Sequence, residues 1–178
     1  MELIYEYLRW RQLLLPGDFA IEVGCPVFLF SRIPVEGVPP GGRNVRTTTG
    51  PLKLMVEVRN LLAERDLKLR TEAHEMRVFR VRPRADGRST LTLGRSREND
   101  LALNHGSVSK HHADLVLADN QVTVVDQQSK NGTDIDQVPV RAPTVIKPGQ
   151  DLRVGGVTMR FLDPARLFDA LSALTEAN

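Results

Sequence analysis

The sequence contains little cysteine and no long apolar segment. Cys25 is its only cysteine, so the chain can form neither an internal disulfide bond nor a cysteine-based metal cage. No segment approaches the roughly 18 consecutive apolar residues of a membrane-spanning helix. A lone cysteine fits a reducing compartment, and the acidic start at Met1–Glu6 differs from the basic start of a secretory signal. We therefore expect a cytoplasmic protein that does not act at a membrane.

An excess of one charge is also absent. The 24 lysine and arginine residues nearly balance the 22 aspartate and glutamate residues, and the net charge is +2. The densest basic stretch lies between Arg77 and Arg88, and we interpret its arginines as a solvated strand surface rather than a track for nucleic-acid phosphates. With 41% hydrophobic and 26% charged residues, the composition is that of a globular protein. Nucleic acid is not an expected partner.

The first 30 residues predict a helix followed by a strand. Apolar side chains recur along one loose stripe in residues 2–15, and Pro16-Gly17 ends that pattern. The members of the stripe are Ile4, Tyr7, Leu8, Leu14 and Leu15. The wholly apolar run Val27–Phe30 predicts a buried strand, and periodicity alone leaves other structures open.

The rest of the N-terminal region changes character twice. Residues 33–51 are rich in proline and glycine, which predicts an irregular loop. Residues 52–75 contain neither, and their apolar spacing predicts a helix. Its heptad seam is interrupted by Arg65 and Glu72, so ordinary packing is favoured over a coiled coil. Residues 1–75 contain no motif that we assign to a family, and we interpret them as an adaptor-like extension of unknown role that packs on the remainder.

From Met76 onward the pattern is that of short β-strands separated by turns. Leu91 and Leu93 alternate with polar neighbours, as residues of a half-buried strand do. Dipeptides such as Asp119-Asn120 and Asn131-Gly132 mark the turns. Many short strands at this spacing predict an all-β sandwich or barrel. The predicted strands are residues 77–82, 90–94, 101–103, 113–118, 122–126, 133–135, 138–140, 152–154 and 158–162.

The last residues predict a short amphipathic helix over 164–178. Asp163 can cap its start, and Pro164 suits the first helical position. The predicted apolar face consists of Leu167, Phe168, Leu171 and Leu174.

Polar residues in the predicted loops form a recognisable series. Gly94-Arg95 ends one strand, Ser109-Lys110-His111-His112 follows in the next loop, and Asp126-x-x-Ser129-Lys130-Asn131-Gly132-Thr133 comes shortly after. This series closely resembles the forkhead-associated (FHA) family, a group of phosphothreonine-binding modules. The resemblance covers about half of the chain. It implies an FHA-type antiparallel β-sandwich at residues 76–163, in a mainly β protein with an α-containing N-terminal extension.

The resemblance assigns phosphate binding to Arg95, Ser109 and Lys110. The guanidinium of Arg95 can donate paired, charge-assisted hydrogen bonds to phosphate oxygens; a surface ion pair with Glu98 or Asp100 is the alternative. Ser109 offers a small hydroxyl donor, and its alternative is a turn-stabilising serine. Lys110 matches a position that is often basic in the family, and a solvated lysine is almost equally favoured.

The resemblance gives the histidines and the Asn-Gly turn separate roles. It makes His112 a buried structural histidine that joins the binding loops, with His111 as its exposed neighbour. The Asn131-Gly132 pair predicts a tight turn, because both residue types tolerate positive φ.

Further roles follow from the same match. The side chain of Asn131 would hydrogen-bond the backbone of a bound peptide. Gly94, Gly132 and Thr133 would support the loops, and Lys130 would add positive charge or select peptide residues beyond the phosphothreonine. The four histidines show no recognised metal spacing, and no catalytic triad or cofactor motif is present.

The sequence therefore predicts a non-catalytic reader of threonine-phosphorylated proteins, and a Ser/Thr kinase is implied. An alternative is an adaptor that binds proteins independently of phosphate through the FHA fold and the flanking helices. An enzyme within residues 1–75 ranks far below, because that stretch has no convergent motif. The identity of the partner and the oligomeric state do not follow from the sequence.

One further hypothesis concerns Thr47, Thr48 and Thr49 in the loop of residues 33–51. A kinase that reached this loop would create a phosphothreonine tethered to the chain's own binding site, at an effective concentration of up to about millimolar. The alternative of three threonines in an ordinary polar loop is favoured.

Overall fold

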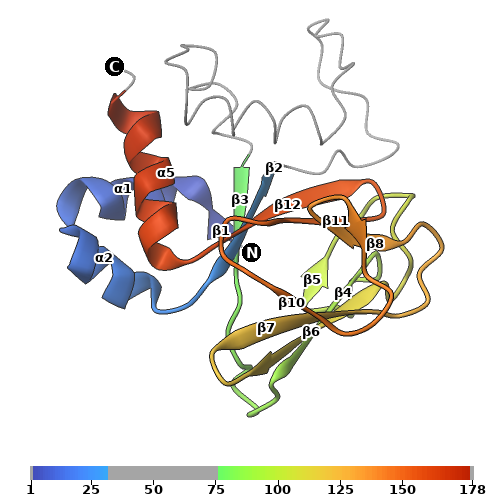
Figure 1. The fold of residues 1–178 in the computed structure, drawn as a ribbon. Helices are drawn as coiled ribbons and strands as arrows, with labels where there is room; N and C mark the ends of the chain where they lie inside the picture. Colours follow the sequence, from blue (N-terminus) through green and yellow to red (C-terminus); the bar gives the residue numbers. More distant parts are fainter. Residues whose placement is uncertain (1, 32–75, 177–178) are drawn as a thin grey trace, which may run out of the picture.

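The computed structural model describes residues 2–31 and 76–176 (Figure 1). Strands dominate the chain after Met76, and helices stand at both ends of the described residues. The elements in chain order are β1 (Glu2–Leu3), α1 (Ile4–Leu13), α2 (Pro16–Val23), β2 (Val27–Ser31), β3 (Met76–Arg80), β4 (Thr90–Gly94), β5 (Leu101–Ala102), β6 (Ala113–Ala118), β7 (Gln121–Asp126), β8 (Thr133–Ile135), β9 (Val138–Pro139), β10 (Thr144–Ile146), β11 (Asp151–Val154), β12 (Val157–Leu162) and α5 (Pro164–Glu176).

The strands form two sheets that face each other (Figure 1). One sheet has the order β1-β3-β2-β12-β11-β8-β9, and the other has the order β10-β7-β6-β4-β5. Neighbouring strands are antiparallel except for β4 and β5, which are parallel. The predicted mainly β sandwich is thus confirmed, with one parallel pair that the sequence did not reveal.

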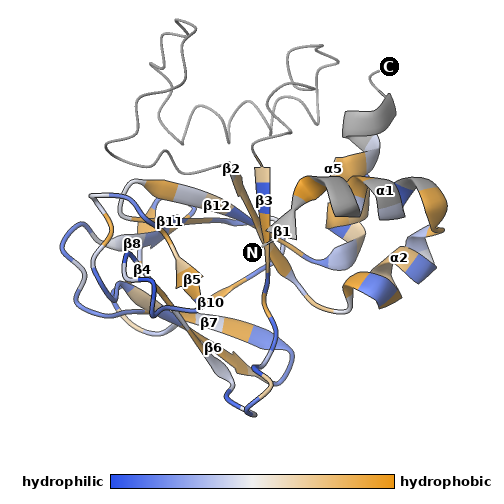
Figure 2. Ribbon diagram, turned by 180° about the vertical axis from the view of Figure 1, so that it is seen from behind, coloured by the Kyte–Doolittle hydropathy of each residue, from blue (hydrophilic) through white to orange (hydrophobic). Residues whose placement is uncertain are grey.

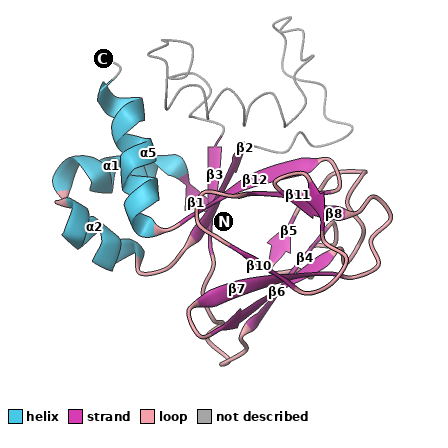
Figure 3. Cartoon of the chain, in the orientation of Figure 1, coloured by secondary structure: helices cyan, strands magenta, loops and turns pink. Residues whose placement is uncertain are grey.

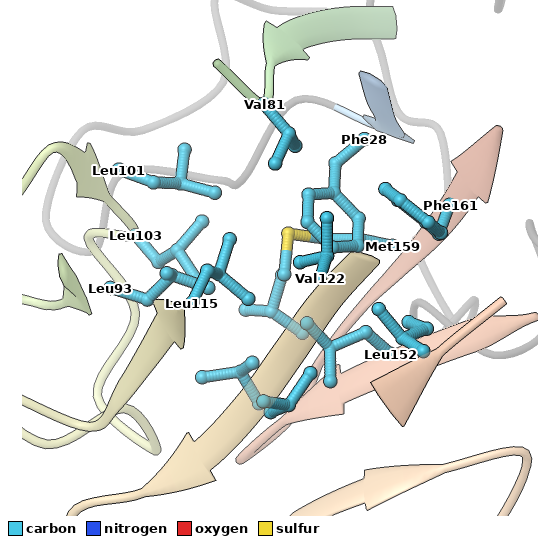
Figure 4. Packing of buried hydrophobic residues seen from close by; sticks show 14 of the residues in the cluster. Phe28, Val81, Leu93, Leu101, Leu103, Leu115, Val122, Leu152, Met159 and Phe161 are labelled. Carbon is cyan, nitrogen blue, oxygen red and sulfur yellow. The ribbon is translucent and has the colours of Figure 1, made fainter. Parts of the chain in front are cut away.

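The space between the sheets is filled by apolar side chains from both (Figure 4). Leu93 and Leu115 come from the five-stranded sheet, and Met159 and Phe161 come from the other. The rings of Phe28 and Phe161 pack with their centroids 5.1 Å apart. Burying one such side chain contributes roughly 1.5–3 kcal/mol, so this layer is the main source of the sandwich's stability.

A second apolar cluster lies on the outer face of the seven-stranded sheet, beneath the helices (Figure 3). Successive strand residues point to opposite faces, so Val27 and Leu29 of β2 pack in this cluster while Phe28 and Phe30 pack in the sandwich core. Both faces of β2 are therefore covered. This explains why Val27–Phe30 is apolar without interruption, and the predicted buried strand is confirmed.

The division between the extension and the sandwich does not interrupt the sheet. β2 pairs with β3 along its whole length, from Val27 opposite Arg80 to Ser31 opposite Met76. On its other side it pairs with β12, where Phe28 lies opposite Phe161. Residues before 76 therefore supply strands to the same sheet as residues after it.

The prediction of one helix over residues 2–15 was incomplete. The chain forms β1 first, then α1, and then the further helix α2, which begins where the pattern was expected to end. Pro16 occupies the first turn of α2, where a missing N–H costs nothing, and the left-handed Gly24 (φ +66°) ends it. Leu15 was expected in the apolar stripe but is exposed, because it precedes α2 in an extended conformation.

Most predicted strands are confirmed within a residue or two. β10 was missed, since Val145 is exposed on an edge strand and gives no alternating pattern. At the C-terminus, Asp163 caps α5 by accepting a hydrogen bond from the backbone N–H of Arg166 at 2.7 Å. The loop predicted for residues 33–51 and the helix predicted for residues 52–75 lie outside the described residues.

Candidate functional site

Three loops meet at one end of the sandwich, where the hydropathy colouring of Figure 2 is mainly hydrophilic. They follow β4 (residues 95–100), join β5 to β6 (residues 103–112) and join β7 to β8 (residues 127–132). Backbone hydrogen bonds tie the first two together: the N–H of Arg95 donates to the carbonyl of Ser109 at 2.8 Å, and the N–H of Ser96 donates to that of Lys110 at 3.1 Å.

Gly94 permits this close approach of the first two loops. A Cβ atom at this position would collide with the carbonyl oxygen of Lys110 and would lie 2.9 Å from the Cα of His111. The side chain of Asn99 then fastens the crossing, because its Nδ2 donates to the carbonyls of Ser96 at 2.8 Å and Lys110 at 2.7 Å. Asn99 was not among the residues chosen from the sequence, since nothing local distinguishes it from an ordinary loop residue.

His112 joins the second loop to the third. The residue is buried; its Nδ1 accepts a hydrogen bond from the backbone N–H of Ser109 at 3.0 Å, and its Nε2 lies 3.1 Å from the carbonyl oxygen of Gly132. The Nδ1 acceptor role places the ring proton on Nε2, which donates to Gly132. Burial lowers the pKa of His112 and outweighs the hydrogen bond to Gly132 and the charge of Asp126, which raise it. The ring is therefore neutral at physiological pH.

The side chains of Ser109 and Asn131 complete the contact between these loops. The Oγ of Ser109 accepts a hydrogen bond from the backbone N–H of Lys130 at 3.1 Å. The Nδ2 of Asn131 donates to the carbonyl of Ser107 at 2.7 Å. Each residue retains hydrogen-bonding capacity, because a hydroxyl keeps its own donor hydrogen and an amide keeps its oxygen.

Asp126, the last residue of β7, accepts hydrogen bonds that hold the third loop. Its carboxylate accepts hydrogen bonds from the N–H of Ser129 at 3.0 Å, the hydroxyl of Ser129 at 2.6 Å and the hydroxyl of the buried Thr133 at 2.6 Å. Burial acts to raise the pKa of Asp126, but these hydrogen bonds and the neighbouring His112 prevail and lower it. The carboxylate is therefore ionised and serves as an acceptor for the whole turn.

The backbone of the third loop departs from the predicted turn. Gly132 has φ +75°, as expected, but the other residue with positive φ in this loop is Gln128 (φ +52°) rather than Asn131. The reversal is thus spread over a longer segment than a two-residue Asn-Gly turn. The hydrogen bonds to Asp126 compensate the strain at Gln128.

A fourth segment, the β11–β12 turn, supports the site and was not predicted to do so. The N–H of Gly156 donates to the Oγ of Ser107 at 2.7 Å, and the N–H of Gly155 donates to the carbonyl of Gly132 at 3.0 Å. A Cβ on Gly155 would lie 2.5 Å from the carbonyl oxygen of Ser107, the same oxygen that holds Asn131. The sequence signals were Ser107 and the Gly155-Gly156 pair, which resemble ordinary turn residues.

The rim of the site carries uncompensated positive charge. Arg95, Lys110 and Lys130 are exposed, and none of their side chains has an ion-pair or hydrogen-bond partner among residues 2–31 and 76–176. Arg95 does not form the alternative ion pair with Asp100. Asp100 instead pairs with Arg84 and accepts hydrogen bonds from Thr92. The rim can therefore attract an anion.

The predicted phosphopeptide-binding and loop-supporting residues all belong to this one assembly, whereas Thr47, Thr48 and Thr49 lie outside the described residues. In the part of the chain that the structure describes, no group of three or more histidine, cysteine, aspartate and glutamate side chains is placed to hold a metal ion. None of the described helices is long and apolar enough to cross a membrane.

The fold and the site define a β-sandwich whose loops at one end are joined by hydrogen bonds and carry exposed cationic side chains. Comparison with known families identifies it further: residues 91–155 match the model of the family described as FHA domain. Residues 91–155 of the chain are thus matched to the FHA-domain family. The matched range contains the three loops and all of the predicted binding residues.

Curated relatives share this part of the sequence. The chain is 34% identical over 79 residues to an oxoglutarate dehydrogenase inhibitor of Corynebacterium diphtheriae. The aligned residues make up 44% of this chain and 54% of the relative. It is 35% identical over 71 residues to the glycogen accumulation regulator GarA of Mycobacterium tuberculosis. These residues make up 40% of this chain and 43% of GarA. The chain thus spans about half the length of the curated relatives it matches. Their names describe regulators.

Solved FHA structures also align with the chain. The FHA domain of the CT664 protein from Chlamydia trachomatis aligns with a TM-score of 0.44 at 24% identity, covering 49% of this chain and 85% of that domain. The structure of Mycobacterium tuberculosis EmbR in complex with a low-affinity phosphopeptide aligns with a TM-score of 0.45 at 20% identity, covering 62% and 30% respectively.

Proposed function

We propose that this protein is a non-catalytic module that binds threonine-phosphorylated partners through the three-loop site. The observation that carries the proposal is the convergence of Arg95, Ser109 and Lys130, whose backbones are linked through Ser109. Two of the three carry exposed cations without a partner among the described residues, so the site presents charge that this part of the chain does not neutralise.

The chemistry of these groups suits a phosphate. A phosphothreonine carries a charge of about −1.5 to −2 and three strong acceptor oxygens. Arg95 can meet two of those oxygens with its planar fork of donors. The hydroxyl of Ser109 already accepts from Lys130, so its own hydrogen is free to donate to a third oxygen. Lys110 adds charge at the rim.

The rest of the peptide would be held by Asn131. Its Nδ2 is fixed on Ser107, which orients the amide and leaves the Oδ1 atom as an acceptor for a peptide N–H. The likeness to the FHA family supports phosphothreonine over phosphoserine, because in that family the threonine methyl group fills a small pocket.

The proposal includes a regulatory rather than a catalytic role, downstream of a Ser/Thr kinase that modifies the partner. The names of the relatives, an enzyme inhibitor and a regulator of glycogen accumulation, support this role. The single cysteine, Cys25, fits a reducing cytoplasm as the place where the protein acts.

A second candidate function is phosphate-independent binding of a protein by the helical layer. The observation that favours it is the exposure of three large apolar side chains on and between α1 and α2: Leu13 is 70% exposed, Leu15 73% and Ile21 80%. Substituting all three by polar residues would then abolish partner binding, whereas substitutions in the three loops would leave it unchanged.

A peptide panel tests the leading proposal. We expect the protein to bind a subset of a phosphothreonine peptide library, the phosphoserine forms of those peptides more weakly, and the unphosphorylated forms not measurably. Equal binding of phosphorylated and unphosphorylated peptides would reject the phosphate site and favour the second candidate.

A further inference from the structure

A basic groove of about 550 Å³ opens where the chain passes from β3 to β4. Three arginines, Arg80, Arg82 and Arg84, are among its lining residues, against one acidic residue, Asp100. Phe79 and Leu91 contribute apolar surface to the same groove. A concave surface with apolar walls and an excess of positive charge is a typical site for an acidic ligand.

The three arginines differ in what already holds them. Arg80 lies over the rings of Tyr7 and Trp10, 5.7 and 5.4 Å from their centroids, and its Nε donates to the Tyr7 hydroxyl at 3.0 Å. Arg84 forms an ion pair with Asp100. Arg82 is exposed and makes no ion pair or hydrogen bond with the residues that the structure describes. One guanidinium is thus available to a ligand, between two that are fixed.

The groove shares one lining residue, Asp100, with the loop that carries Arg95. Asp100 lies at the end of that loop, and its Oδ2 accepts a hydrogen bond from the N–H of Thr92 in β4 at 2.8 Å. Thr92 precedes Arg95 by three residues, and a strand rises by about 3.3 Å per residue. The place where Thr92 holds Asp100 therefore lies about 10 Å from the backbone of Arg95, a distance that an extended peptide spans with about three residues.

We propose that this groove binds an acidic segment of the same phosphorylated partner, about three to five residues from its phosphothreonine. The inference rests on the proposed function and adds a feature of the partner that the phosphate site does not determine. Nucleic acid is the less suitable ligand, because its backbone requires a continuous track of free cations. Here Arg80 and Arg84 are already engaged, which leaves Arg82 as the one lining arginine without an ion pair or hydrogen bond among the described residues.

Three phosphothreonine peptides test the groove: one with neutral flanks, one with aspartates on the N-terminal side at the stated spacing, and one with aspartates on the C-terminal side. We expect one acidic peptide to bind about three- to tenfold more tightly than the neutral peptide at low salt, with a smaller gain at high salt. Arg82→Ala should remove this gain and leave the affinity for the neutral peptide unchanged.

Arg88→Ala is the matched control. It removes the same charge from an exposed arginine that pairs with Asp86 and is not among the groove's lining residues, so the acidic gain should persist. Unchanged thermal unfolding would show that both variants fold.

Two outcomes would overturn the groove while leaving the phosphate site intact: no gain for either acidic peptide, or a gain that survives Arg82→Ala. A single-stranded DNA probe that binds more tightly than the acidic peptides and is lost in Arg82→Ala would also overturn it. Absence of binding to all three peptides would instead reject the proposed function and the groove with it.

Discussion

The Nε2 of His112 donates a hydrogen bond to the carbonyl oxygen of Gly132 across 3.1 Å and 20 positions of sequence. The same ring accepts the backbone N–H of Ser109 at its other nitrogen. Two loops that would carry the phosphopeptide are thus held by one neutral side chain in the interior. Their geometry is fixed before any ligand arrives, which lowers the entropic cost of binding.

Replacing His112 should therefore reduce stability first and binding second. His112→Ala leaves the N–H of Ser109 and the carbonyl of Gly132 without their buried partner, which typically costs about 1–3 kcal/mol of unfolding free energy. We expect a lower melting temperature in thermal unfolding and a modest loss of phosphopeptide affinity. A variant with the wild-type melting temperature and no binding would show that His112 contacts the ligand itself.

The neutral state of His112 also predicts a pH dependence. Its pKa in the folded protein lies below the ordinary value of 6.5, so the unfolded chain binds a proton at higher pH than the folded chain does. The free energy of unfolding should accordingly fall as the pH decreases below about 6.5. Urea unfolding at a series of pH values measures this directly.

Asp126 acts in a separate and more acidic range. Its pKa is lowered from 3.8, so its ionised carboxylate adds to the free energy of unfolding above that pH. This stabilisation is lost as the pH falls through the pKa of Asp126 in the folded protein. The decrease in unfolding free energy with falling pH just below pH 6.5 should therefore disappear in His112→Gln and persist in Asp126→Asn. An unchanged slope in His112→Gln would assign it to other groups.

Asp126→Asn itself should destabilise the third loop. The two oxygens of Asp126 accept from the N–H of Ser129 and from the hydroxyls of Ser129 and Thr133, and an asparagine amide offers only one acceptor oxygen for these donors. We expect a loss of about 1–3 kcal/mol in unfolding free energy. Asp119→Asn, in an exposed turn with φ +49°, is the control and should change it by less than about 0.5 kcal/mol. Equal effects would reject this role for Asp126.

Gly94 offers a test of the loop crossing. Gly94→Ala would force the backbones of Lys110 and His111 apart, since the new Cβ meets main-chain atoms that have no room to move. Overpacking of this kind typically costs about 1–3 kcal/mol or more. Gly17→Ala in α2 has no atom within 4 Å of the new Cβ and should stabilise the protein by up to about 1 kcal/mol. A neutral Gly94→Ala would contradict the described crossing.

Much of the sandwich could be predicted because its signals are local. Leu91 and Leu93 alternate within one strand, and Asp119-Asn120 marks the hairpin between β6 and β7. The position of β2 could not be predicted in the same way. β2 pairs with β12, where Phe161 lies opposite Phe28 from more than 100 residues away in the sequence. Strand pairing at that separation leaves no pattern in the sequence of either strand.

The residues of the site likewise differ in whether a local sequence signal predicts them. Binding roles were predicted for Arg95, Ser109 and Asn131 because their spacing resembles that of a family, whereas the contacts of Ser107 and Asn99 were not predicted. Both of these residues act by hydrogen bonding to backbone atoms of another segment. Such contacts depend on how loops cross in space, and the groove lined by Arg82 likewise exists only after the two sheets have packed.

Calorimetric titration of Arg95→Ala with a phosphothreonine peptide that the wild-type protein binds tests the phosphate site most directly. The side chain of Arg95 has no ion-pair or hydrogen-bond partner among the described residues, so its removal should leave the fold unchanged. Each charge-assisted hydrogen bond to phosphate contributes roughly 1.5–3 kcal/mol, which predicts an affinity loss of about tenfold to several hundredfold. Wild-type affinity in a folded Arg95→Ala protein would contradict the phosphate site.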